Sequence, residues 1–187
     1  MAINVRETNL EEIQARLKEM NTDLNQVNYL EAALSSGGFS LEIKRYLYGE
    51  LSKLLEGRKM LERAAKAISN KAGIEPMKKD KIEGYLKAAE LYSQIGKVEE
   101  ADDMFRRATR DTTPSDHARV VLARKNIYMK FAKELESKQK RASAIKFYER
   151  LFKMSLDDSE KASVKESLLG LYKALGLFSE AKMIEGL

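Results

Sequence analysis

Apolar side chains recur every three or four residues along most of this 187-residue chain. In the first third the series runs through Leu10, Ile13, Leu17, Met20, Leu24, Val27, Leu30 and Leu34. Because an α-helix has 3.6 residues per turn, this spacing gathers the apolar side chains on one helical face, whereas a half-buried strand would need strict alternation. Only two prolines occur in the whole sequence. The pattern therefore predicts an all-α protein.

The first unit, residues 1–74, is expected to be a long antiparallel helical hairpin. Residues 10–34 carry a spacing close to that of a coiled-coil seam, and a matching series continues over 47–68. Between them, Ser-Ser-Gly-Gly at 35–38 supplies glycines that can end a helix. A loop this short makes the two helices antiparallel neighbours. An exposed apolar stripe on such a hairpin also makes a homodimer through residues 9–70 a candidate assembly.

The second unit, residues 75–187, is expected to contain about six shorter helices. We place them at about 79–95, 98–110, 115–138, 140–154, 158–175 and 178–186. Gly96, Pro114 and Gly176 mark three of the breaks, since glycine ends helices and proline favours their first turn.

A weak repeat runs through this second unit, from about residue 79 to 187. Its first copy is marked by Tyr85, Ala88, Ala89, Tyr92, Gly96, Ala101, Phe105 and Ala108. Its second copy is marked by Tyr128, Phe131, Ala132, Leu135, Ala144, Tyr148 and Leu151, and a third begins at Leu168, Tyr172, Gly176 and Ala181. The pattern resembles the tetratricopeptide repeat (TPR), a helix–turn–helix unit of 34 residues. The longer spacing between Ala101 and Ala144 is similar to that of the SNAP-type adaptors of vesicle fusion.

The resemblance implies a short TPR-like α-solenoid that binds a peptide or a helix of a partner on the face formed by the first helix of each pair. The residues at those positions are Glu83, Leu86 and Glu90 in the first copy and Asn126, Met129, Lys133 and Glu136 in the second. Lys133 and Asn126 do not have the arrangement of the clamp that some TPR proteins use for a C-terminal carboxylate. A non-enzymatic adaptor or scaffold with a mixed groove is the function that the resemblance favours.

A basic stretch gives a second candidate surface. Residues 119–153 contain eleven Lys and Arg against three Glu. Arg124, Lys140 and Arg141 are its candidate contacts, either with an acidic protein or with the phosphates of a nucleic acid. Lysines are also common on helix surfaces that only face solvent, so this stretch need not bind anything. Nucleic-acid binding and homo-oligomeric assembly are the two alternatives to the adaptor.

Several functional classes are disfavoured by composition. The chain has no cysteine and one histidine, which leaves no thiolate chemistry and no histidine-based triad or metal site. The acidic residues at 99–103 belong to a helix N-terminus, where negative charge is favoured anyway. No apolar run reaches the length of a membrane span. We therefore expect no enzyme activity, no cofactor, no metal and a cytoplasmic location.

Overall fold

The computed structural model describes residues 5–110 and 112–186, and ten α-helices lie within them. The helices are α1 (Leu10–Glu19), α2 (Asp23–Ser36), α3 (Leu41–Gly57), α4 (Leu61–Gly73), α5 (Lys78–Gln94), α6 (Val98–Thr109), α7 (Pro114–Ser137), α8 (Arg141–Phe152), α9 (Asp158–Ala174) and α10 (Phe178–Glu185). The all-α prediction is confirmed.

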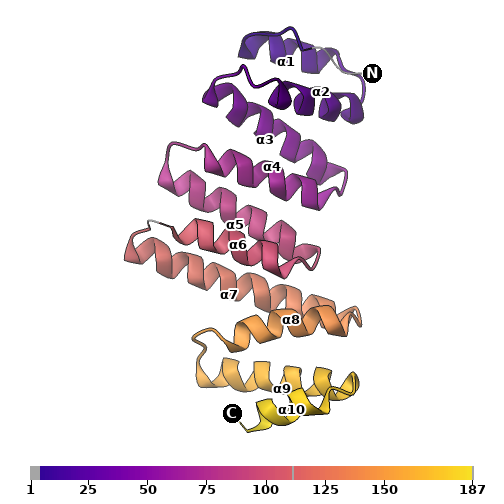
Figure 1. The fold of residues 1–187 in the computed structure, drawn as a ribbon, viewed down its shortest axis with the longest axis vertical. Helices are drawn as coiled ribbons and strands as arrows, with labels where there is room; N and C mark the ends of the chain where they lie inside the picture. Colours follow the sequence, from indigo (N-terminus) through magenta and orange to yellow (C-terminus); the bar gives the residue numbers. More distant parts are fainter. Residues whose placement is uncertain (1–4, 111, 187) are drawn as a thin grey trace.

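The helices are stacked in chain order along one direction, with the two ends of the chain at opposite ends of the stack (Figure 1). From α2 onward each helix packs on the next one, and α5 also contacts α7. One apolar core follows the stack, from Ile13 in α1 to Ala181 in α10. The structure is therefore an extended helical array in which neighbours in sequence are neighbours in space.

The first third differs from the expected long hairpin, because it contains four helices instead of two. Met20 has an extended backbone, and the side chain of Thr22 accepts a hydrogen bond from the amide of Asn25 at 3.3 Å, which starts α2. Lys59 adopts φ 60° and separates α3 from α4. The apolar spacing continues across both breaks, so periodicity alone does not reveal them.

The six helices expected after residue 75 are confirmed, and their ends lie within two residues of the predicted ones. The break before α7 is set by Thr113 and Pro114. The Thr113 hydroxyl accepts from the amide of Asp116 at 3.2 Å, and Pro114 occupies the first turn, where its missing N–H costs nothing.

Four turns of the array have the same geometry. They join the helical pairs α3/α4, α5/α6, α7/α8 and α9/α10, and each contains one residue of positive φ, which we call the turn residue. The turn residues are Lys59 (60°), Gly96 (77°), Gln139 (59°) and Gly176 (73°). In every case the next amide donates to the carbonyl five residues earlier at 2.9 Å: Met60 to Leu55, Lys97 to Tyr92, Lys140 to Leu135, and Leu177 to Tyr172. This 6→1 bond satisfies a carbonyl at the helix end and fixes the angle at which the second helix leaves.

An alanine lies five residues after each turn residue, where the second helix crosses the first. These alanines are Ala64, Ala101, Ala144 and Ala181, and all four are buried. A side chain of one carbon lets the two helices approach closely, so the same local sequence produces the same pair four times. The first of these pairs, α3/α4, lies in the part of the chain where the sequence showed no repeat.

The packing is continuous past residue 74. A Cβ added to Gly84 of α5 would lie 2.7 Å from the Cβ of Ala72 in α4, so the absence of a side chain at Gly84 is what allows this close contact. α4 and α5 thus pack as tightly as helices within a pair. The division into units at residues 1–74 and 75–187 stays a prediction.

Candidate functional site

The predicted groove residues lie on two helices that contact each other. Glu83, Leu86 and Glu90 are on α5, and Asn126, Met129, Lys133 and Glu136 are on α7. Their spacing of three or four residues places each set on one face of its helix. Lys130 of α7 donates to Glu90 of α5 at 2.9 Å and ties the two faces together. The structure therefore brings these two helices side by side, as the repeat implied.

Two of the groove carboxylates already have partners within the protein. Glu90 pairs with Lys130, and Glu136 accepts a hydrogen bond from the hydroxyl of Tyr148 at 2.8 Å. Met129 and Leu86 are half-buried, whereas Lys133, Asn126 and Glu83 are exposed. The surface open to a partner thus combines two apolar side chains with polar and charged neighbours.

The three residues of the basic stretch are not brought together. Arg124 lies in the first half of α7, while Lys140 and Arg141 flank the start of α8. About thirteen residues of α7 separate them, which corresponds to roughly 20 Å along the helix. Lys140 and Arg141 are exposed, and Arg141 donates to the side chain of Gln139 at 2.8 Å.

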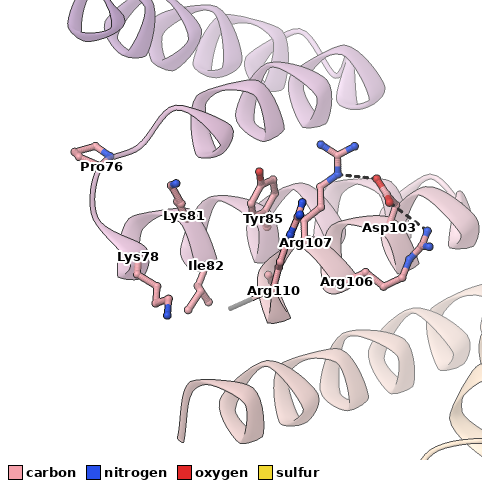
Figure 2. A pocket seen from close by; sticks show the side chains of 10 residues that line it. Pro76, Lys78, Lys81, Ile82, Tyr85, Asp103, Arg106, Arg107 and Arg110 are labelled. Carbon is pink, nitrogen blue, oxygen red and sulfur yellow. Dashed lines mark hydrogen bonds and ion pairs between the residues drawn. The ribbon is translucent and has the colours of Figure 1, made fainter. Parts of the chain in front are cut away.

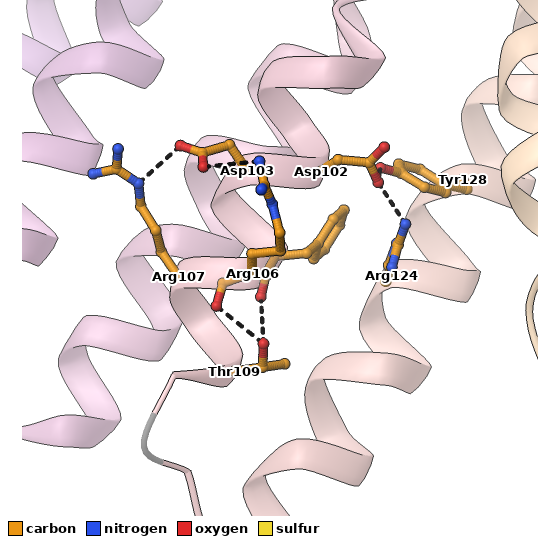
Figure 3. Close-up of polar contacts among 8 residues, drawn as sticks. Asp102, Asp103, Arg106, Arg107, Thr109, Arg124 and Tyr128 are labelled. Atoms are coloured by element: carbon orange, nitrogen blue, oxygen red, sulfur yellow. Dashed lines mark hydrogen bonds and ion pairs between the residues drawn. The ribbon is translucent and has the colours of Figure 1, made fainter.

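Arg124 belongs to a network centred on Asp102 of α6, which the sequence did not indicate (Figure 3). The Asp102 carboxylate accepts hydrogen bonds from Arg124, from the Tyr128 hydroxyl at 2.7 Å and from Nε of Arg150 at 2.6 Å. The guanidinium of Arg124 also lies over the ring of Tyr128, 5.4 Å from its centre. The bond to Asp102 raises the pKa of Arg150. One carboxylate on α6 thus holds side chains from α7 and α8.

Four of the five aromatic residues of the basic stretch lie in the core. Tyr128, Phe131, Phe147 and Tyr148 are all buried. Stacking on nucleic-acid bases requires exposed rings, so these side chains are not available for it. The fifth aromatic residue, Phe152, is half-buried, and the ammonium group of Lys161 lies 5.7 Å from its ring centre. Nucleic-acid binding through this surface stays a prediction that rests mainly on phosphate contacts.

Buried tyrosine hydroxyls link α7 to α6, α8 to α7 and α9 to α8. Each donates to a carboxylate of the helix before it: Tyr128 to Asp102 at 2.7 Å, Tyr148 to Glu136 at 2.8 Å, and Tyr172 to Glu149 at 2.7 Å. Burial is the main cause that raises the pKa of all three groups, that of Tyr148 to about 12. The carboxylates add to it by favouring the neutral phenol.

Alkaline pH should therefore destabilise the array. A tyrosine in the unfolded chain ionises near pH 10, below the pKa of these groups in the folded protein, so their contribution is present below pH 10 and is lost above it. The expected loss is about 1.4 kcal/mol per tyrosine for each pH unit above 10. Urea unfolding at pH 9 and pH 11 measures it, and a Tyr148→Phe variant should show a smaller drop. A free energy of unfolding that stays the same between these pH values would contradict this assignment.

An open pocket of 840 Å³ lies between the first half of α5 and the second half of α6 (Figure 2). Its lining includes five cationic side chains, those of Lys78, Lys81, Arg106, Arg107 and Arg110. Asp103, the one acidic residue among the lining residues, pairs with Arg107 Nε at 2.8 Å and with Arg106 at 3.2 Å. The sequence analysis did not identify this site, because its residues come from two segments that are joined only through the turn at Gly96.

Within residues 5–110 and 112–186, no three His, Asp or Glu side chains are grouped closely enough to hold a metal ion. No helix in these segments combines the length and the apolar character needed to cross a bilayer. Comparison of the sequence with models of known protein families and with curated proteins finds no match.

Proposed function

We propose that this chain is a TPR-like helical array. The support is the turn geometry that recurs in four helical pairs. Each pair has a buried residue four positions before the turn residue, an alanine five positions after it and the 6→1 hydrogen bond. The turn residues are 37, 43 and 37 residues apart. The longer middle interval comes from the 24-residue helix α7, which is the feature behind the proposed similarity to SNAP-type adaptors.

As its function we propose non-enzymatic binding of a peptide or helix of a partner protein on the face that α5 and α7 share. The observation that carries this proposal is the half-buried Met129 and Leu86, which lie on two helices that contact each other and are bridged at the surface by the Lys130–Glu90 pair. A rigid face of this kind binds without first being ordered, which lowers the entropic cost of association. An amphipathic helix or an extended peptide could place apolar side chains on it.

Replacing Met129 and Lys133 with alanine should abolish capture of the partner without changing the helical content. Pull-downs from native lysate compare this variant with the parent protein and with a matched control, Lys182→Ala/Met183→Ala, which changes the same residue types on the exposed surface of α10. The proteins retained should be lost only with the α7 variant, and nuclease treatment should not remove them.

Capture that persists in the α7 variant would exclude this face. Capture that disappears after nuclease treatment would favour the nucleic-acid alternative instead. Circular dichroism of each variant checks that the array is intact.

A further inference from the structure

The pocket between α5 and α6 has the same three kinds of side chain as the Asp102 site between α7 and α8. In each site, two of these three side chains lie 15 and 11 residues before the turn residue of the pair, and the third lies 11 residues after it. In the α5/α6 pair, counted from Gly96, these are Lys81, Tyr85 and Arg107. In the α7/α8 pair, counted from Gln139, they are Arg124, Tyr128 and Arg150. Both sets are cation, tyrosine and arginine at the same distances in sequence from the turn residue. Tyr128 is buried, whereas Tyr85 is half-buried and lines the pocket.

In the α7/α8 pair these three side chains bind a carboxylate. That carboxylate is Asp102, which accepts from both arginines and from the tyrosine hydroxyl. Its side chain is only 19% exposed, so the site holds the acid largely away from water. The protein itself thus shows which chemical group this constellation binds.

In the α5/α6 pair the corresponding three side chains line an open pocket instead. The hydroxyl of Tyr85 lies beside Gly73 at the end of α4, and this glycine has no side chain that could supply a carboxylate. In the described parts of the chain, no carboxylate lies within ion-pairing distance of Lys78 or Lys81. Asp103 pairs with Arg106 and Arg107 of its own helix and not with the two lysines across the pocket.

We propose that the α5/α6 pocket binds a carboxylate side chain from an acidic segment of a partner protein. Ile82, Tyr85 and Ala108 give the pocket an apolar part that suits an aliphatic neighbour of the acid. A volume of 840 Å³ is within the range of a pocket for a single compact ligand. The five cations line one pocket between two neighbouring helices rather than a groove along the array, which favours a peptide over a nucleic-acid backbone. This pocket is separate from the face of Met129 and Lys133, so loss of binding at either surface leaves the other intact.

The test is an NMR titration of the full chain with a blocked nonapeptide that contains four glutamates among leucine and glycine. The amides of Lys81, Tyr85 and Arg107 should shift, and the analogue with glutamine in place of glutamate should bind at least roughly tenfold more weakly. Lys78→Gln/Lys81→Gln should weaken binding of the glutamate peptide by roughly tenfold, whereas the charge-matched control Lys66→Gln/Lys182→Gln, at exposed positions outside both candidate surfaces, should leave it within roughly twofold.

Asp103→Asn should have the opposite effect and strengthen binding by roughly threefold, because it removes the acid that competes for Arg106 and Arg107. Equal binding of the two peptides, or equal losses in both lysine and control variants, would overturn the proposal. So would tighter binding of inorganic phosphate or of a ten-nucleotide single strand at the same residues. Thermal unfolding of each variant shows whether a loss of binding reflects a loss of fold.

Discussion

Replacing Phe105 with alanine should lower the free energy of unfolding by about 3–5 kcal/mol. Phe105 is 2% exposed, and its ring meets that of Tyr128 edge-on at 5.4 Å and 88°. Tyr128 is packed in the same manner on Phe147, at 5.4 Å and 71°. The three rings join α6, α7 and α8, so removing the first leaves a cavity between two helical pairs and ends the aromatic contact. Urea unfolding followed by circular dichroism measures the change.

Phe178→Ala is the matched control for this substitution. The Phe178 side chain is 68% exposed at the end of the array, and its removal should change the free energy of unfolding by less than about 0.5 kcal/mol. If the two variants lost the same stability, the packing of α6 on α7 through Phe105 would not be as described.

Asp102→Asn should be the second most disruptive change, with a loss of about 2 kcal/mol. The carboxylate accepts hydrogen bonds from three side chains on two other helices, and an amide can replace only one of its two oxygens. The amide N–H₂ group would then face the cationic side chains of Arg124 or Arg150. Because Asp102 keeps some contact with water, the effect is smaller than that for a fully buried ion pair.

The neighbouring residue provides the control, because Asp103→Asn makes the same chemical change one position along the helix. Asp103 is 36% exposed and pairs only with arginines of its own helix, so its replacement should cost less than about 0.5 kcal/mol. A difference between the two variants isolates the network across helices. Equal losses would mean that Asp102 acts as an ordinary surface residue.

The helices after residue 75 could be predicted because local signals agree with the packing. Gly96 and Gly176 have the positive φ that glycine adopts most easily, and Pro114 starts a helix where its fixed φ is favourable. The alanines at 101, 144 and 181 lie at the positions where paired helices cross. In this part of the chain, local sequence signals mark most of the helix ends.

The first third was harder because the two missed breaks, after α1 and after α3, have neither a proline nor a glycine of positive φ. Lys59 takes the left-handed conformation without being glycine, and the apolar series passes through Met20 and Asn21 as if the helix continued. The first of the four pairs, α3/α4, has its alanine at Ala64 and its turn residue at Lys59. Its similarity to the other pairs is one of backbone geometry, so it became visible only in the structure.

The candidate sites were predicted in part for a similar reason. Glu90 and Met129 lie on α5 and α7, which contact each other, and the expected groove between them stays a prediction. Arg124 was expected on an open basic surface, but it reaches Asp102 on the preceding pair. Contacts between residues 22 to 48 positions apart depend on how the pairs stack, which local sequence does not specify.

Small-angle X-ray scattering of the full chain tests the stacked arrangement of helical pairs most directly. A compact domain of this length has a radius of gyration of about 16 Å. The extended array predicts a clearly larger value, with an elongated distance distribution and a scattering mass equal to that of one 21.3 kDa chain. A monomer with a radius of about 16 Å and a symmetric distance distribution would contradict it.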